Sequence, residues 1–277
     1  MTIALLTLLL WVGALGAGML GALTGLGGGV VIVPLLTLVF HVDIHYAIGA
    51  SLVSVIATSS GAAAAFVREG YSNIRIGMFL EVATTVGALA GAFVAPWVSP
   101  SATAVVFGLV LLHSVYTSTH PPEATPDAPQ DPLATRLRMN GSYPSAEGPR
   151  SYNVRGVPGG AALMFVAGAL SGLLGIGSGA VKVLAMDQVM RIPFKVSTTT
   201  SNFMIGVTAA ASAGVYLGRG YVDPGLAMPV MLGVLIGSMV GARVLARART
   251  HVLRTVFAVV ILVLAVEMIF NGLTGRI

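Results

Sequence analysis

Cysteine is absent from this chain of 277 residues, and only 9% of the residues are charged. Without cysteine the protein has no disulfide, no thiolate nucleophile and no cysteine ligand for a metal. With 56% hydrophobic residues and a mean hydropathy of +0.90, charge is too sparse for a water-soluble globular domain. The composition therefore predicts a membrane protein that crosses the bilayer several times.

Motifs for nucleotide or covalent chemistry are also missing. The chain has no Walker motif, no dinucleotide-binding fingerprint after a strand, and no pattern typical of a nucleophile with its base. The net charge of +5 does not indicate nucleic acid, because lysine and arginine lie in short loops between apolar segments. We therefore expect no enzyme activity, no cofactor, no nucleic-acid partner and no transport driven by ATP.

The chain instead contains one glycine-rich turn twice. Residues Gly25 to Gly29 are GLGGG and residues Gly175 to Gly179 are GIGSG, an offset of 175 − 25 = 150 positions. Outside the turns the same offset matches Ser51 with Ser201, Thr58 with Thr208, Tyr71 with Tyr221, Gly87 with Gly237 and Gly91 with Gly241. A match of this extent predicts two copies of one structural unit.

Hydropathy divides each copy into one long segment, broken by the glycine turn, and three segments of about one membrane crossing. In the first copy, residues 1–118, the segments cover 3–40, 46–67, 74–94 and 102–117. In the second copy, residues 157–277, they cover 157–190, 196–217, 225–245 and 252–270. Residues 119–156 are rich in Pro, Asp, Glu, Ser and Arg, which predicts a polar, disordered cytoplasmic linker.

Basic residues in the loops indicate that the two copies have opposite orientations. In the first copy the basic loop is the one after residue 67, whereas in the second copy the neighbours of the equivalent loop carry the charge. If each broken segment doubles back, all of the 15 basic residues except Lys182, Arg219 and Arg276 lie on one side. We therefore predict inverted repeats, whose re-entrant or hairpin segments enter from opposite faces and meet at their glycine tips.

The two glycine turns are candidate anion-binding elements. A break in mid-membrane leaves backbone N–H groups without helical partners, and the next helix turns its positive end toward the break. Two such ends would enclose a small anion. The candidate residues are Gly27, Gly28, Gly29, Gly177, Ser178 and Gly179. The alternative is that glycine only permits close helix packing, which we prefer for Gly87 and Gly91.

Two ionisable residues lie inside apolar segments. An ammonium costs roughly 2.5 to 3.5 kcal/mol at mid-bilayer. Lys182 is therefore a counter-charge for an anionic substrate, or else a snorkelling lysine or a partner of Asp187. Glu81 is a candidate for proton coupling, or else a partner of an arginine such as Arg75. The sequence leaves both choices open.

Hydroxyl and amide side chains near the turns are candidate substrate donors. We select Ser51, Ser201 and Asn202, because such groups donate to sulfonate or carboxylate oxygens without the desolvation cost of a charge. The alternative is helix capping or hydrogen bonding between helices. The cluster of His41, Asp43 and His45 has the spacing of metal ligands, but its polar loop favours a solvated face, and we expect no metal site.

Three stretches together resemble the TauE/SafE family of sulfite and organosulfonate exporters: TGLGGGVVIVPLL, GIGSGAVKVL, and KVSTTTSNFMIGV at residues 195–207. The resemblance covers both copies and omits the linker. It implies a small prokaryotic inner-membrane permease with two similar halves that moves small anions such as sulfite. Two departures, Ser178 in place of a glycine and Leu184 where the first copy has Pro34, imply that the half-sites are not equivalent.

The composition and the repeat predict an all-α secondary transporter of a small anion, and the resemblance implies that it exports sulfite or an organosulfonate across a bacterial plasma membrane. Alternating access would rock one inverted repeat against the other within the lipid bilayer. An anion channel, a membrane accessory subunit and an intramembrane enzyme are the alternatives.

Overall fold

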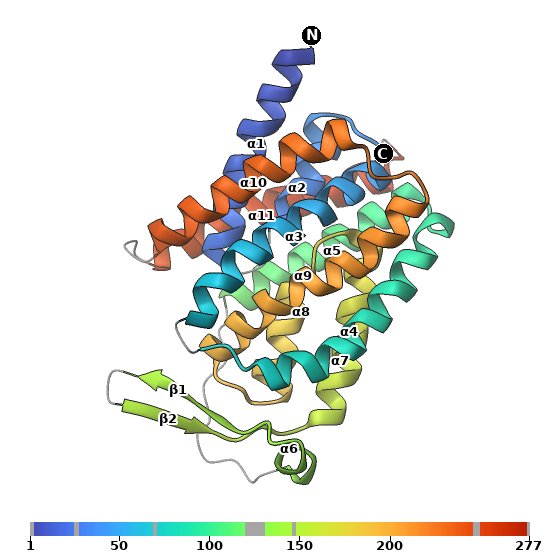
Figure 1. The fold of residues 1–277 in the computed structure, drawn as a ribbon. Helices are drawn as coiled ribbons and strands as arrows, with labels where there is room; N and C mark the ends of the chain where they lie inside the picture. Colours follow the sequence, from blue (N-terminus) through green and yellow to red (C-terminus); the bar gives the residue numbers. More distant parts are fainter. Residues whose placement is uncertain are drawn as a thin grey trace.

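The computed structural model describes residues 3–24, 28–68, 71–119, 131–145, 148–245 and 250–275, and most of them are helical (Figure 1). The first copy comprises α1 (Ile3–Thr24), α2 (Gly29–Pro34), η1 (Leu35–Val39), α3 (Ile44–Arg68), α4 (Ile74–Val94), η2 (Ala95–Trp97) and α5 (Pro100–Thr119). The middle of the chain forms α6 (Pro132–Arg136), β1 (Gly141–Ser145) and β2 (Gly148–Tyr152). The second copy comprises α7 (Val157–Leu174), α8 (Gly179–Leu184), η3 (Ala185–Val189), α9 (Phe194–Gly218), α10 (Pro224–Leu245) and α11 (Thr250–Leu273).

The helices have the apolar outer surface of a membrane protein. Among the described residues, Ile74–Trp97, Val157–Leu174 and Pro224–Gly241 are long and apolar enough to cross a bilayer. On α4, Val82 and Met78 are 68% and 63% exposed, so large apolar side chains face outward. Water does not favour such a surface, and lipid does.

The duplication is visible in the backbone of the broken segments. η1 and η3 are π-helical turns at equivalent positions, 150 residues apart, and each follows a six-residue α-helix. His41 and Arg191, again equivalent, both adopt a left-handed conformation with φ of 53° and 56°. The exchange of Pro34 for Leu184 therefore leaves the backbone path unchanged.

Each broken segment doubles back on itself. In the second copy the backbone N–H of Arg155, before α7, donates to the carbonyl of Met190, after η3, over 3.0 Å. In the first copy Gly13 of α1 lies against the side chain of Leu35 in η1. The two arms of each segment are therefore antiparallel neighbours that begin and end at the same end of the molecule.

The two copies interlock instead of forming separate bundles. α1 packs along α10, and its counterpart α7 packs along α4. Glycine makes both approaches possible, because a Cβ added at Gly168 would lie 2.0 Å from the carbonyl oxygen of Thr84, and one at Gly18 would lie 2.3 Å from that of Val234. Gly87 and Gly91 likewise face the backbone of α7, so the preferred interpretation of these two residues as packing residues is confirmed.

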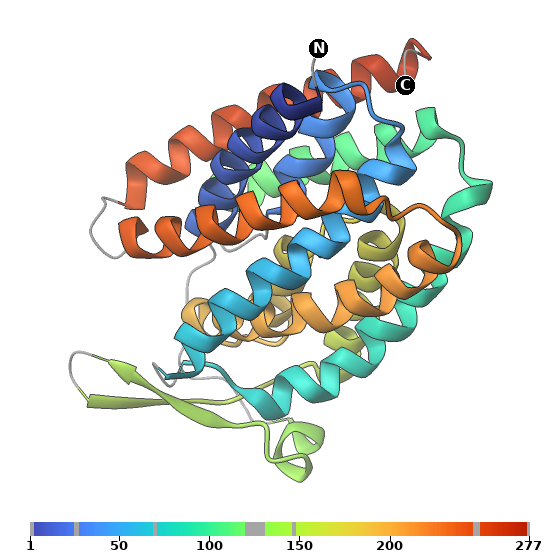
Figure 2. The same cartoon turned by 45° about the horizontal axis from the view of Figure 1, so that its top comes forward.

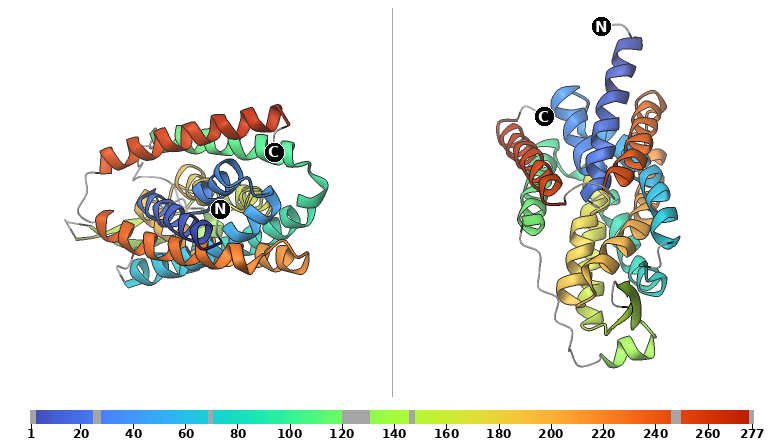
Figure 3. Two further views of the ribbon diagram at one scale, coloured as in Figure 1. Left: turned by 90° about the horizontal axis from the view of Figure 1, so that it is seen from above. Right: turned by 90° about the vertical axis from the view of Figure 1, so that its left-hand side faces the viewer.

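Helix directions follow from the same contacts. Gly168 faces Thr84 and Gly172 faces Ala88, so α7 and α4 run in the same direction. α5 and α11 lie side by side along one edge of the molecule (Figure 3). There Gly108 faces Ile269, whereas Gly272 faces residues near the start of α5, so these two equivalent helices are antiparallel.

The segment before α7 is structured from residue 131, which corrects two expectations. α6 and the antiparallel hairpin β1–β2 lie at one end of the helical body (Figures 1 and 2), so the described chain is not all-α and residues 131–145 and 148–156 are not disordered. The segment buries Met139, Tyr152 and Val154, whose wide spacing among polar residues hides the apolar signal. Asn73, the N-cap of α4, donates to the Tyr152 hydroxyl over 2.7 Å and so ties the hairpin to the bundle.

Asp131 joins this segment to the second copy. Its carboxylate accepts from the N–H of Leu133 in α6 and from the N–H of Val157, the first residue of α7. These backbone hydrogen bonds lower the pKa of Asp131 below its ordinary value, and the one from Leu133 has the largest effect.

Candidate functional site

The two glycine turns meet in the middle of the molecule. In Figure 3 helix α1 of the first copy and helix α7 of the second approach each other from opposite ends of the molecule. The Ser51 hydroxyl, on α3, donates to the Gly175 carbonyl oxygen over 2.7 Å, and a Cβ added at Gly29 would lie 2.8 Å from the same oxygen. Gly28, beside it, is buried against the side chain of Val234. Gly27 lies outside the described residues.

The second turn has the more unusual backbone. Gly175, Gly177 and Ser178 all have positive φ, of 67°, 69° and 45°. Ser178 is strained there, because a side chain disfavours this conformation, and its buried hydroxyl has no hydrogen-bond partner. The described residue at the equivalent place, Gly28, has an ordinary φ of −64°. Gly179 begins α8, where the chain returns to helix.

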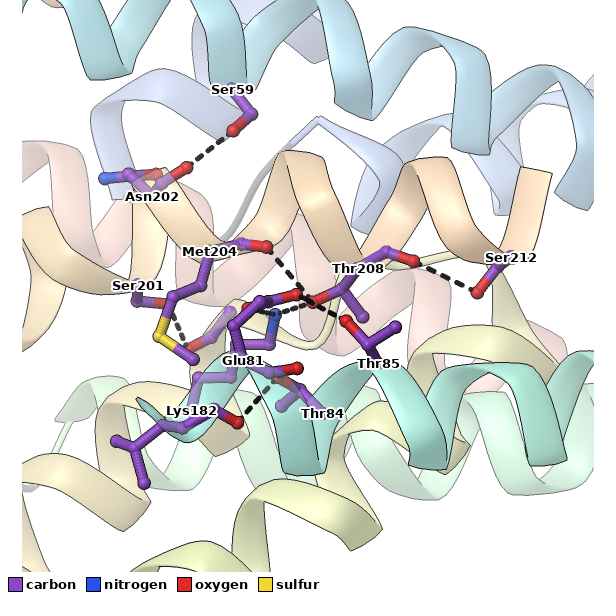
Figure 4. Close-up of polar contacts among 12 residues, drawn as sticks. Ser59, Glu81, Thr84, Thr85, Lys182, Ser201, Asn202, Met204, Thr208 and Ser212 are labelled. Atoms are coloured by element: carbon purple, nitrogen blue, oxygen red, sulfur yellow. Dashed lines mark hydrogen bonds and ion pairs between the residues drawn. The ribbon is translucent and has the colours of Figure 1, made fainter. Parts of the chain in front are cut away.

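Two of the predicted donors, Ser51 and Ser201, donate their hydroxyl hydrogen bonds inside the protein. Ser51 donates to Gly175 as described above, and Ser201, its repeat mate on α9, donates to the carbonyl of Gly179 over 3.3 Å. The carbonyl of Asn202 accepts from the hydroxyl of Ser59 over 2.6 Å, which joins α3 to α9 (Figure 4). In this conformation the hydroxyls of Ser51 and Ser201 therefore support the second turn, as the alternative of hydrogen bonding between helices proposes.

Lys182 and Glu81, which the sequence singled out separately, lie together. The Lys182 side chain is fully buried, and its Nζ donates to Oγ1 of Thr208, on α9, over 2.5 Å. Thr208 in turn donates to Glu81 Oε1 over 2.6 Å, and Lys182 Nζ lies 4.0 Å from Glu81 Oε2. Figure 4 shows these three side chains converging between α4 and α9. The arrangement is a buried ion pair bridged by one hydroxyl.

Neither residue takes the partner that its own segment offers. Lys182 does not pair with Asp187, which instead interacts with the charge of Arg191. Glu81 does not pair with Arg75, whose guanidinium donates to a backbone carbonyl of the linker. The pair links α4 of the first copy to α8 of the second, and nothing local in the sequence indicates that approach.

The Glu81 carboxylate is unevenly coordinated. Oε1 accepts from Thr208 and also from the hydroxyl of Thr85, over 3.2 Å. Oε2 is buried and accepts no hydrogen bond. A buried carboxylate oxygen with only a distant ammonium beside it is poorly compensated for its loss of water.

The charged half of the site has no counterpart in the other copy. The repeat mates of Lys182 and Glu81 are Ile32 and Met231, both apolar. Thr58, the mate of Thr208, donates only to carbonyls of its own helix. Thr208 was not among the predicted site residues, although its match to Thr58 at the repeat offset was the signal that could have selected it.

The cluster near His41 spans the loop before α3 and the first turn of that helix. Asp43 accepts from the ring of His45 over 3.2 Å, and that ring stacks on Tyr221 with centroids 5.2 Å apart. Asp43 is more than half exposed, which agrees with a solvated face. Among the described residues no group of three potential metal ligands comes together.

The fold and the site define a membrane protein of two related, interlocked halves, with paired glycine turns and one buried ion pair between them. The chain belongs to the family described as sulfite exporter TauE/SafE, which it matches over residues 10–268. It is 28% identical over 264 residues to the "Probable membrane transporter protein YunE" of Bacillus subtilis, covering 93% of this chain and 95% of that protein. A "Probable membrane transporter protein" of Xylella fastidiosa is 26% identical over 275 residues, 98% of each chain. No solved structure matches the chain.

Proposed function

We propose that this protein is a secondary transporter that moves a small anion across a bacterial inner membrane by alternating access. The observation that carries the proposal is the buried ammonium of Lys182, four residues after the strained Ser178 of the second glycine turn. A fixed positive charge at this depth attracts an anion that has lost its water. The unpartnered Ser178 hydroxyl supplies a hydrogen-bond donor on the same turn.

An inverted repeat is the topology that we propose for this site. The antiparallel directions of α5 and α11, the cross-packing of α1 with α10 and of α4 with α7, and the opposite loop charges all support it. In such a protein the glycine tips enter from opposite faces, and the substrate lies where they meet. Rocking of one copy against the other then exposes that point to each side in turn.

Sulfite or an organosulfonate is the substrate that we propose, moved outward. The family description supports the substrate class and the direction. The chemistry of the site supports a compact oxyanion, because one ammonium and one hydroxyl would each contact a different oxygen atom.

Uptake and counterflow in proteoliposomes test this function, with sulfite, thiosulfate, sulfoacetate and lactate as the panel. We expect saturable movement of sulfite or sulfoacetate, and loss of that movement in Lys182→Met. The matched control is Lys195→Met, which removes an exposed lysine and leaves the site untouched. Movement of none of the four anions would overturn the transporter assignment. Flux that rises without saturation would favour an anion channel.

A further inference from the structure

The ion pair between Lys182 and Glu81 is formed by both copies, so it must respond when the copies move. Glu81 belongs to α4, whereas Lys182 and Thr208 belong to α8 and α9. α4 packs against α7 and α9, both from the second copy. A motion of one copy against the other therefore changes the surroundings of this pair directly.

The other ionisable groups near the pair come from the elements that pack against it. α7 contributes none. The elements packed against α4, α8 and α9 contribute Arg75 and Lys195 in the first turns of their helices, Asp187 opposite Arg191, and Tyr216, His113, Tyr116, His45, Tyr46 and Arg68. Among the described residues, His45 pairs with Asp43, and neither Lys182 nor Glu81 forms an ion pair with any of these groups. The site is therefore neutral when Glu81 is ionised and no anion is present.

An anion that binds Lys182 disturbs this neutrality. If Glu81 stayed ionised, one ammonium would face two negative groups in a buried site, and the unpaired carboxylate would carry the full cost of burial. Uptake of one proton by Glu81 removes that cost. Oε2, which accepts no hydrogen bond, is the oxygen free to take the proton.

Thr208 permits the change without backbone movement. Its single hydroxyl proton has two acceptors within reach, Glu81 Oε1 at 2.6 Å and the carbonyl of Met204 at 3.0 Å. With Glu81 ionised the hydroxyl donates to the carboxylate. With Glu81 protonated on Oε2, Oε1 remains an acceptor, and the Thr208 hydroxyl either keeps this hydrogen bond or turns to the Met204 carbonyl. Thr208 is therefore a positioning residue that serves both charge states.

We infer that the substrate anion replaces the Glu81 carboxylate as the counter-ion of Lys182, and that Glu81 takes up one proton in the same step. The inference rests on the proposed transport function. In charges, the ionised pair plus one monoanion and one proton gives a lysine–anion pair and a neutral glutamic acid, with a net charge of zero on both sides. One proton accompanies each monoanion, and the loaded site is electrically neutral.

The test measures protons and anions in the same vesicles, using the panel anion that moves, a trapped pH dye, and a potential set with potassium and valinomycin. For the wild type we expect coupled proton flux and, for a monoanion, little dependence on the potential. Glu81→Gln fixes the glutamate position as neutral, so the ratio of protons to anions falls by one and transport becomes driven by the potential. Wild-type movement of a monoanion that carries charge without protons would overturn the inference but leave the transporter assignment standing.

Two further variants separate coupling from structure. Thr208→Val removes the bridging hydroxyl, and we expect a shifted pH profile of transport with anion affinity changed by less than about tenfold. Thr84→Val is the matched control, because this neighbouring hydroxyl donates only to carbonyls of its own helix. If Glu81→Gln lowered only the melting temperature and left the proton-to-anion ratio unchanged, the pair would be structural and the inference wrong.

Discussion

The first and second glycine turns occupy equivalent places in two copies of one unit, yet their chemistry differs. Around the first turn, the repeat positions hold Gly28 and Ile32, and the π-helical turn that follows is apolar apart from a threonine. Around the second, the same positions hold Ser178 and Lys182. The backbones of the arms after both turns agree down to the π-helical turn and its left-handed end.

This difference shows that, in a duplicated membrane protein, the residues that pack the helices can be shared by both copies while the charged residues of the site belong to only one pairing. The glycines that pack helices occur in both copies, because each copy must approach the other equally closely. The charge occurs once, because two buried lysines facing one small anion would repel each other and cost twice the desolvation. One asymmetric site between two symmetric arms is the result.

The largest expected effect concerns the opposite entry of the two arms. Asp43→Cys and Pro193→Cys place single thiols at equivalent loops, in a chain that has no other cysteine. We expect a membrane-impermeant maleimide to label one variant only from outside and the other only from inside. Labelling of both from the same face would exclude inverted repeats.

The second-largest effect is expected when the buried lysine that distinguishes the second turn from the first is removed. Lys182→Met leaves Glu81 buried without its cation, which costs about 3–5 kcal/mol, so uptake should fall by about 100-fold or more and the melting temperature should drop. The double variant Lys182→Met, Glu81→Met removes both charges. We expect it to recover the melting temperature in detergent but not uptake, because the anion has no counter-charge. Recovery of uptake would show that Lys182 is not a substrate group.

A smaller effect, on stability, is expected when the glycines that pack one copy against the other are replaced. Gly168→Ala and Gly18→Ala each bring a methyl group against a carbonyl of the other copy, so both should lose about 1–3 kcal/mol of stability. Gly214→Ala, at a helical glycine with nothing within 4 Å, should instead gain up to about 1 kcal/mol. Thermal unfolding in detergent compares the three. Equal losses in all three would mean that the interlocked interfaces are not tight.

The smallest effect comes from making the second turn resemble the first. Ser178→Gly relieves a side chain held at a φ of 45°, so stability should stay the same or rise by up to about 1 kcal/mol. Loss of the hydroxyl should raise the KM of the transported anion by up to about tenfold. The melting temperature should therefore rise or stay constant, while KM rises. A KM that does not change would remove Ser178 from the binding site.

Much of the architecture could be predicted from the amino-acid sequence, because a segment that lies in lipid must be a continuous run of apolar residues. Long apolar segments, the repeat offset of 150 positions and the two glycine turns indicated a duplicated membrane protein whose broken segments double back. Lys182 and Glu81 stood out individually for the same reason, since charge in an apolar segment is costly. The hairpin β1–β2 escaped notice because its few buried residues are spread among polar ones.

Only the tertiary structure decided which groups meet. The approach of Glu81 to Lys182 through Thr208 depends on α4 of one copy crossing α8 and α9 of the other, and the interlocking of α1 with α10 follows from the same arrangement. Hydropathy and loop charge describe how each segment meets lipid and water, and contain no information on how separate segments pack. Lys182 and Glu81 were therefore each visible in the sequence, whereas their joining into one buried ion pair required the packing of both copies.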